Sequence, residues 1–357
     1  MTDRRTFLKG LLAASAAPGL SWADAGGPAF IACAQDPGGG FALAGLALDG
    51  ATAFRVPLPA RGHAGAAHPG RPLAIVFARR PGYYALVVDC VSGAVAARLA
   101  PPPGRQFNGH GVLIDGGARL VTSEQDAATS QGWLGLWSAR DGWRRTGEIA
   151  SGGIGPHDVR LMPDGRTLAV ANGGIATDAA DRRKLNLDVM RPNLAWIDPD
   201  SGVTAIAEPD PALRQNSIRH LAVHPDGTVA FAMQWEGDPA LSPPLLGFGR
   251  QGGGALRLAA VPEAERAAMK GYAGSIAWNA AGTEVAITSP RGGRVQRFDA
   301  AGRFAGSFAR ADACGIAPFG AGFLLSDGGG GLIVLEGDGA RPLSHADLAW
   351  DNHIVAL

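Results

Sequence analysis

The chain has 357 residues, and its 32 basic and 32 acidic side chains give a formal net charge of zero. This balance provides no basic stripe to hold phosphates, so nucleic acid is not expected as a partner. Three cysteines are too few, and odd in number, for a disulfide framework. The 53 glycines and 25 prolines, with many short β-like runs between them, favour repeated hairpins over helices.

Residues 1–25 are expected to be an export signal and not part of the fold. Arg-Arg at residues 4–5 precedes a modest apolar stretch, and the small-residue pattern Ala-Asp-Ala follows at residues 23–25. This segment resembles a twin-arginine signal, which implies a periplasmic protein with no stable membrane span once the signal is cleaved near Ala25. That export route carries proteins already folded and often loaded with a cofactor, which favours a bound metal.

Residues 26–357 predict one domain built from two alternating series of hairpins. In one series an apolar run meets an Asp/Gly turn and a second run follows, as in "YALVVDCVSGAVAARLA" at residues 84–100. Seven such outer hairpins can be counted. The inner series supplies six partners, which begin near His63, His110, His157, His220, Ser275 and Cys314.

The chain ends supply the missing inner pair. The C-terminal "NHIVAL" would lie beside "PAFIACAQ" at residues 28–35, so that both ends close one blade. Closure of the ring removes the open sheet edges that would otherwise leave backbone groups unpaired. The predicted fold is therefore all-β, a seven-bladed β-propeller closed by pairing of the N- and C-terminal strands.

The repeat register places five histidines at one end of the predicted channel. The loops entering the innermost strands of a propeller share a face, which would gather His63, His110, His157, His220 and His353. Imidazole suits iron, copper, nickel and zinc, and its second nitrogen is commonly held by a carboxylate or carbonyl. We therefore expect a transition metal, iron or copper, at this mouth. The same rim would receive, behind the histidines, Glu124, Asp126, Asn172, Glu236 and Asp327.

Several segments resemble known exported propellers. With the twin-arginine start, "FNGHGV", "GPHDVRL", "SIRHLAVHPDG" and "WDNHIVAL" resemble a bacterial exported family of unknown function (domain of unknown function 1513). The resemblance covers nearly all of residues 26–357, and more broadly it extends to lactonase-like and quinoprotein-like seven-bladed propellers. Members tend to be encoded near imelysin-type proteins and other components of iron acquisition. The resemblance thus implies a monomeric accessory protein of iron or metal uptake, but brings no established activity.

Two other interpretations of the histidines stay open. WD-repeat propellers carry a structural Gly-His pair at this blade position, and "NGHG" around His110 fits that pattern, although a matching Trp-Asp pair occurs only at residues 350–351. The protein would then be an interaction scaffold without metal. A lactonase-like or quinoprotein-like enzyme would instead use a metal to polarise a carbonyl or activate water, with Glu124 or Glu236 as base.

The remaining candidates have simpler expected roles. His68 and His224 belong to hairpin turns on the opposite face, and His345 to a solvated loop. Cys33 and Cys90 are expected to be buried thiols, and Cys314 is either a buried thiol or a softer metal ligand.

An insertion from Gly173 to Asn193 lengthens the fourth repeat. Its apolar residues Leu185, Leu187 and Met190 would pack an ordered connection between blades. Alternatively, its basic run makes it a lid or a docking loop for a periplasmic metal-uptake protein, since long loops at propeller rims often carry function.

Overall fold

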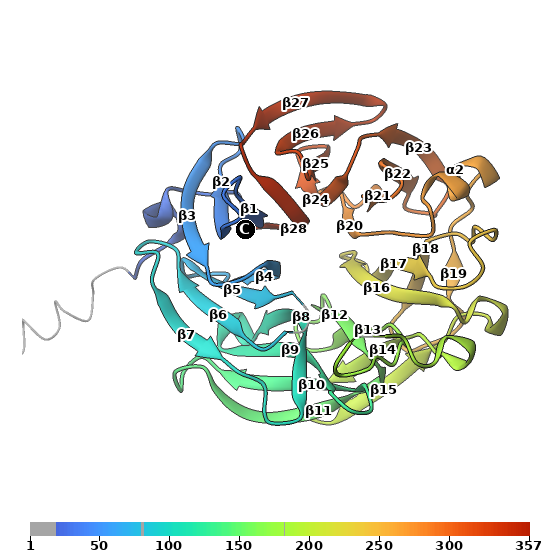
Figure 1. Ribbon diagram of the computed structural model, residues 1–357, viewed down its shortest axis with the longest axis horizontal. Helices are drawn as coiled ribbons and strands as arrows, with labels where there is room; N and C mark the ends of the chain where they lie inside the picture. The colour runs from blue at the N-terminus through green and yellow to red at the C-terminus, as the bar shows by residue number, and fades with distance from the viewer. Residues whose placement is uncertain (1–18, 80–81, 182) are drawn as a thin grey trace, which may run out of the picture.

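Seven four-stranded antiparallel sheets form a ring in the computed structural model (Figure 1). The structure describes residues 19–79, 82–181 and 183–357. Most of the predicted export signal, residues 1–18, lies outside the described residues. The all-β, seven-bladed prediction is confirmed, with each sheet as one blade.

The innermost strand of each blade lines the central channel. These strands are β4 (Gly62–Ala67), β8 (Arg105–Ile114), β12 (Pro156–Leu161), β16 (Asn216–Val223), β20 (Ser275–Trp278), β24 (Ala313–Phe319) and β28 (Ala349–Ala356). The second strands are β1 (Phe30–Gln35), β5 (Leu73–Ala78), β9 (Arg119–Asp126), β13 (Leu168–Asn172), β17 (Thr228–Trp235), β21 (Glu284–Ser289) and β25 (Gly322–Asp327).

The outer half of each blade is formed by two further strands. The third strands are β2 (Phe41–Leu46), β6 (Ala85–Asp89), β10 (Gln131–Ser138), β14 (Asn193–Asp198), β18 (Leu246–Arg250), β22 (Arg294–Asp299) and β26 (Gly331–Glu336). The outermost are β3 (Thr52–Leu58), β7 (Val95–Leu99), β11 (Arg144–Ile154), β15 (Gly202–Ala207), β19 (Arg257–Leu258), β23 (Phe304–Ala309) and β27 (Gly339–His345).

The described helices are short connections between strands. They are η1 (Trp22–Ala25), η2 (Asp115–Gly117), η3 (Leu187–Val189), η4 (Pro211–Leu213) and α2 (Glu263–Ala268). Within the described part of the chain, none has the length and apolar character needed to cross a lipid bilayer.

The hydrophobic core lies between neighbouring blades. The middle strands are apolar on both faces, as in β5, where all six residues are buried. Ile75 and Phe77 of this strand pack against Phe107 and Trp137 of the next blade. The outermost strands instead alternate, as in β23, because only one of their faces meets another blade. Burial on both faces of the middle strands therefore holds the ring together.

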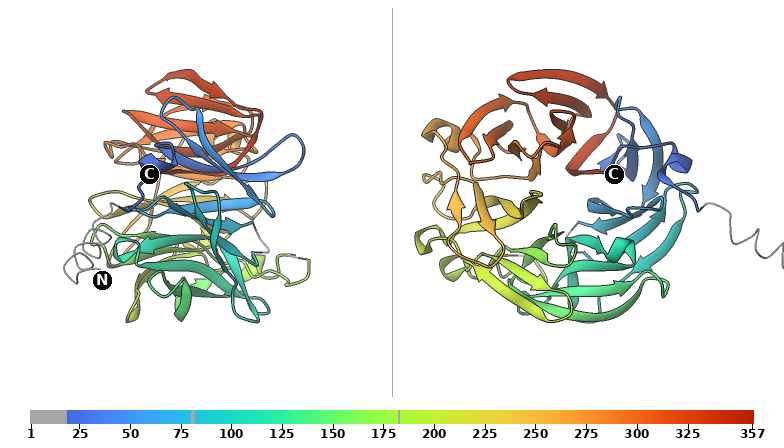
Figure 2. Two further views of the ribbon diagram at one scale, coloured as in Figure 1. Left: turned by 90° about the vertical axis from the view of Figure 1, so that its left-hand side faces the viewer. Right: turned by 180° about the vertical axis from the view of Figure 1, so that it is seen from behind.

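The two ends of the chain close the ring as predicted. β28 pairs antiparallel with β1, so that Phe30 lies opposite Ala356 and Gln35 opposite Ala349. From behind, Figure 2 shows the C-terminus at the inner rim beside the blue strands of the same blade. Because β28 is an innermost strand, the last residues of the chain contribute directly to the channel wall.

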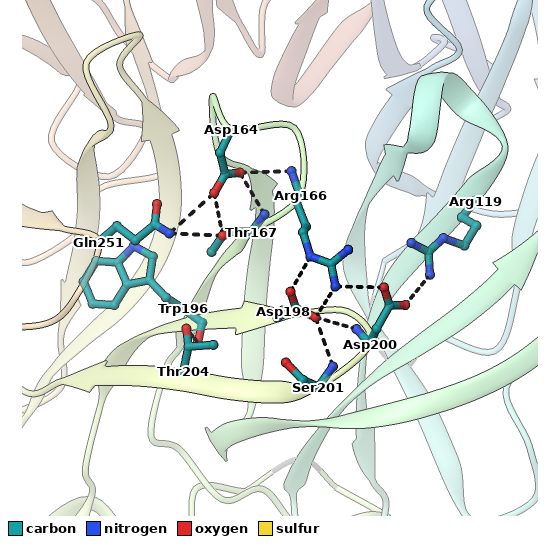
Figure 3. Close-up of polar contacts among 10 residues, drawn as sticks. All are labelled: Arg119, Asp164, Arg166, Thr167, Trp196, Asp198, Asp200, Ser201, Thr204 and Gln251. Atoms are coloured by element: carbon teal, nitrogen blue, oxygen red, sulfur yellow. Dashed lines mark hydrogen bonds and ion pairs between the residues drawn. The ribbon is translucent and has the colours of Figure 1, made fainter.

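Polar turns join neighbouring blades at the end of β12 that lies away from His157 (Figure 3). Arg166, in the turn after β12, binds Asp200 of the β14–β15 turn at 3.0 Å. Arg119 of β9 reaches the same carboxylate at 3.0 Å. On the other side, Gln251 of the β18–β19 turn donates to Thr167 Oγ1 at 3.1 Å. This network connects three consecutive blades and leaves the other end of β12 for the histidines.

Candidate metal centre

Five consecutive innermost strands each place one buried histidine in the channel. In ring order they are His353 of β28, His63 of β4, His110 of β8, His157 of β12 and His220 of β16. None is more than 8% exposed. Neighbouring imidazole centroids lie between 4.6 and 5.0 Å apart. The first and last histidines of this order are also neighbours, because the centroids of His220 and His353 lie 4.8 Å apart. We call these five residues the histidine cluster.

The histidines lie within the strands, and not in the loops that enter them as the repeat pattern suggested. Most of them coincide with a β-bulge. The pairing register shifts between Gly62 and Gly65 around His63, between Phe107 and Gly111 around His110, and between Pro156 and Asp158 at His157. A bulge adds an unpaired residue and re-aims side chains, which is how extended strands can turn several imidazoles toward one centre.

Gly109 shows why the "NGHG" sequence has a glycine before His110. Its φ of +93° lies in the left-handed region, and a Cβ at this position would come within 2.7 Å of the His63 ring. The glycine therefore permits both the bulge and the close approach of two imidazoles from neighbouring blades.

The ring nitrogens are spaced almost closely enough for a shared metal ion. One nitrogen from each of His63, His110, His220 and His353 lies within 4.8 Å of all the others. A tetrahedral ion with metal–nitrogen bonds of about 2.0–2.1 Å would separate its ligands by about 3.3 Å. His157 extends this group, since its Nε2 lies 3.0 Å from His220 Nε2. Inward shifts of about 1 Å would complete a nitrogen coordination shell.

Two buried aspartates hold histidines from neighbouring strands by Nδ1. Asp351 Oδ1 lies 3.4 Å from His63 Nδ1, and Asp158 Oδ1 lies 3.4 Å from His110 Nδ1. A carboxylate on Nδ1 fixes the tautomer in which Nε2 carries the lone pair, which is the usual outer-shell arrangement for histidine ligands. The sequence interpretation did not single out either aspartate, although "PHDV" and "WDNH" place each within two residues of a candidate histidine.

Each aspartate is anchored by further donors. Asp158 Oδ2 accepts from the Leu221 amide at 2.9 Å and lies 3.2 Å from Arg160 Nε. Asp351 Oδ2 lies 2.6 Å from Arg61 Nε. Burial opposes the charge of Asp351, but the hydrogen bond and charge of His63, with the charge of Arg61, outweigh it and lower its pKa to about 2. Asp351 is therefore a fixed anion behind the cluster at neutral pH.

Two members of the cluster, His220 and His353, are held in the uncharged form. Burial, followed by repulsion from His353 and His110, lowers the pKa of His220 well below its usual value. Burial and repulsion from His63 and His110 act in the same direction on His353. Neutral imidazoles have the lone pairs that metal ions require.

The structure places four of the five expected rim residues away from the histidines. Glu124 is fully buried inside a blade, where Arg145 binds it at 2.7 Å and Thr122 at 2.6 Å. Asp126 accepts from the Thr129 amide in its own turn. Asn172 binds Ser151 and Asn193, and Asp327 accepts from Arg310. Only Glu236 lines the same cavity as the cluster, where it pairs with Lys184.

The other sequence candidates have local partners. The His68 ring accepts from the Gly70 amide, and the His224 ring contacts the Gly282 carbonyl of the next blade at 3.1 Å. His345 is exposed at the end of β27. Cys314 donates to the Asp312 carbonyl at 3.1 Å, and burial, with Asp312, raises the pKa of its thiol, so it stays protonated. It is not among the grouped ligand atoms of the described residues.

Two cavities reach the cluster from opposite sides. A polar one of about 250 Å³, which we call the mouth cavity, is lined by His63, His157 and His220. The insertion contributes Ile175, Thr177 and Lys184 to its wall. A larger, more apolar cavity on the other side is lined by His220 and His353. The cluster thus closes the central channel between two openings.

The insertion is both packed and exposed. Met190 is fully buried, whereas Leu185 is 52% and Val189 is 71% exposed. Asn186 donates to the Gly174 carbonyl at 2.9 Å within the insertion, and Arg214, which precedes β16, donates to the Asp188 carbonyl at 2.9 Å. It is therefore an ordered connection that forms part of the mouth.

Comparison with known proteins identifies the family without giving an activity. No curated protein matches the chain. A chain of Kuenenia stuttgartiensis hydrazine synthase is similar in structure, with a TM-score of 0.60 over 90% of this chain and 96% of that one, at 13% identity. At that identity the likeness extends to the propeller fold alone. Residues 56–357 match the family described as "Protein of unknown function (DUF1513)". The protein is therefore a member of the DUF1513 family.

Proposed function

We propose that this protein binds a transition-metal ion, iron or copper, through the histidine cluster. The observation that carries the proposal is the convergence of five buried imidazoles, of which His63 and His110 have a carboxylate on Nδ1. That arrangement presents nitrogen lone pairs to one point and supplies negative charge behind them.

The rival interpretation, a purely structural ring, has a specific difficulty. A structural histidine stabilises a propeller through its hydrogen bonds, yet His353 Nε2 is buried with no hydrogen-bond partner among the described residues. Leaving a buried polar atom unsatisfied costs about 1–3 kcal/mol. A metal ion bound to His353 Nε2 would offset that cost, because it adds a bond that the protein alone does not provide.

The donor set narrows the choice of metal. The grouped ligand atoms are all imidazole nitrogens, with neither thiolate nor carboxylate among them. Imidazole suits copper, iron, zinc and nickel, and does not favour magnesium or calcium. Among the divalent ions, copper binds such sites most tightly in general, so availability in the compartment would decide between copper and iron.

We further propose a periplasmic role in metal uptake. This rests on the twin-arginine-like segment at residues 1–25 and on the resemblance to a family encoded near iron-acquisition components. The insertion would dock the uptake partner through its exposed Leu185 and Val189, at the mouth through which metal would pass. Leu185→Asp with Val189→Asp should then block metal transfer to that partner while leaving metal binding intact. If metal transfer is unchanged, the insertion is only a structural connection between blades and not a docking site.

Calorimetric titration of metal-free protein with Cu(II) and with Fe(II) under anaerobic conditions tests metal binding. One tight site is expected in the wild type, strongly weakened in His110→Ala and His220→Ala. His345→Ala is the matched control, because it removes an imidazole that lies at the exposed end of β27. If wild-type protein binds neither copper nor iron at neutral pH, the histidine cluster has a structural role and the proposal is wrong.

Enzymatic use of the metal has one observation in its favour. Glu236 lies in the mouth cavity with His157 and His220, where a carboxylate could take a proton from a metal-bound water. Turnover of a lactone by metal-loaded protein that is lost in Glu236→Gln would assign this activity. Glu124, the other expected base, is held by Arg145 inside its blade.

A further inference from the structure

The mouth cavity carries an excess of positive charge. Among the described residues, four basic side chains line it, against the single carboxylate of Glu236. Lys184 neutralises Glu236 directly in an ion pair. The other described cations in its wall, all guanidinium groups, are Arg79, Arg219 and Arg291.

Arg219 is the deepest of these groups. It is 8% exposed, and it lies in the bulge of β16, where the pairing with β17 shifts register between Ile218 and His220. A Cβ at Gly173 would come within 3.1 Å of an Arg219 terminal nitrogen, so the glycine leaves room for the guanidinium. Arg219 lines the cavity, and a guanidinium in a cavity wall offers planar N–H donors to the oxygens of an anionic ligand.

The two other arginines approach the cavity from different blades. The Arg291 guanidinium carbon lies 4.5 Å from the centre of the Tyr272 ring, which holds it in place at the cavity wall. Arg79 lies 3.8 Å from Asp351, whose closer partner is Arg61 at 2.6 Å. Asp351 therefore neutralises Arg79 only in part, and net positive charge faces the cavity.

We propose that the mouth cavity binds a small oxyanion, a dicarboxylate or phosphate, through Arg219, Arg291 and Arg79. Planar guanidinium groups match the paired oxygens of carboxylate and phosphate. The volume of about 250 Å³ is sufficient for an anion of a few heavy atoms. One oxygen of such an anion would face His157 and His220, beside the position proposed for the metal.

This inference goes beyond metal binding and does not require it, because the arginines would hold the anion by themselves. Calorimetric titration of metal-free protein at low ionic strength with malonate, and separately with inorganic phosphate, provides the test. Wild-type protein should bind at least one of them. Comparison of the two affinities shows whether the cavity prefers a dicarboxylate or a phosphate. Arg219→Gln and Arg291→Gln should each weaken binding by about 10-fold or more.

Arg303→Gln is the matched control. It removes the same charge from a side chain that is 81% exposed in the turn before β23, and it should leave anion binding unchanged. Arg291 is exposed, so Arg291→Gln should fold even if the buried Arg219→Gln does not. Failure of wild-type protein to bind either anion, or equal binding by wild-type protein and Arg291→Gln, would overturn the proposal. Arg291→Gln should bind copper with the same affinity as wild-type protein. This titration shows whether the metal site is intact when anion binding is lost.

Discussion

The Nε2 atoms of His157 and His220 lie 3.0 Å apart, between the innermost strands of two adjacent blades. At that distance one imidazole must donate and the other accept, because two bare lone pairs would repel. The pair therefore shares a proton between its facing nitrogens. A metal ion would have to displace that proton, so metal binding should release protons.

Removal of His220 should abolish tight metal binding. His220→Ala deletes a proposed ligand that contacts His110, His157 and His353. Loss of an outer-shell group typically lowers metal affinity by about 10- to 100-fold, and loss of this ligand should lower copper affinity by more than that. Competition with a chromophoric chelator measures the affinity, and circular dichroism checks the fold. A folded variant that holds copper as tightly as wild-type protein would contradict the assignment.

The two aspartates should act on the metal indirectly. Asp158→Asn and Asp351→Asn keep the shape of the side chain but remove the charge that faces His110 and His63. Each should weaken metal binding by about 10- to 100-fold without abolishing it. Asp338→Asn, at a side chain that is 94% exposed, is the control. If both buried variants match the control, the carboxylates do not support the ligands.

Acid should destabilise the metal-free protein below the usual histidine range. The pKa values of His220 and His353 are lowered in the folded state, whereas the unfolded chain takes up protons near pH 6.5. The unfolded state thus binds more protons, and the free energy of unfolding should fall by up to about 1.4 kcal/mol per pH unit for each histidine.

Urea unfolding at pH 7, 6 and 5 measures this effect. His220→Gln with His353→Gln should show a shallower dependence over that range. The contribution of Asp351, whose pKa is lowered to about 2, is lost only below about pH 4, so it does not interfere. An equal pH dependence in the double variant and in wild-type protein would show that the two imidazoles are not shielded from protonation.

Deletion of residues 350–357 should unfold the protein and not merely trim it. It removes most of β28, and with it the pairing to β1, the buried Trp350 and Ile354, and the ligand His353. Ile354→Ala is a milder test, and loss of its buried side chain should cost about 2–4 kcal/mol. A truncated chain with the thermal midpoint of wild-type protein would disprove closure by the two ends.

The propeller could be predicted because its signals are local and repeated. Alternating apolar runs and Asp/Gly turns mark the hairpins. Six inner partners for seven outer hairpins required "NHIVAL" to pair with residues near Phe30, as it does. The convergence of the five histidines followed from the same register, since equivalent positions in successive blades face one axis.

The surroundings of the histidines were not predictable in the same way. Strand alternation would point Asp158 away from the side of His157, and only the bulge between Pro156 and Asp158 brings it under His110 of the neighbouring strand. Glu124 was expected at the rim because it comes late in a second strand. It lies inside the blade because Arg145 and Thr122 provide buried partners there, which no pattern in the sequence specifies.

The metal content of protein isolated from its native compartment tests the central claim most directly. Elemental analysis should find close to one iron or copper ion per chain in wild-type protein and in His345→Ala. A folded variant with His110, His157 and His220 changed to Ala should contain none. Native protein free of metal, or a triple variant that retains the full amount, would contradict the account.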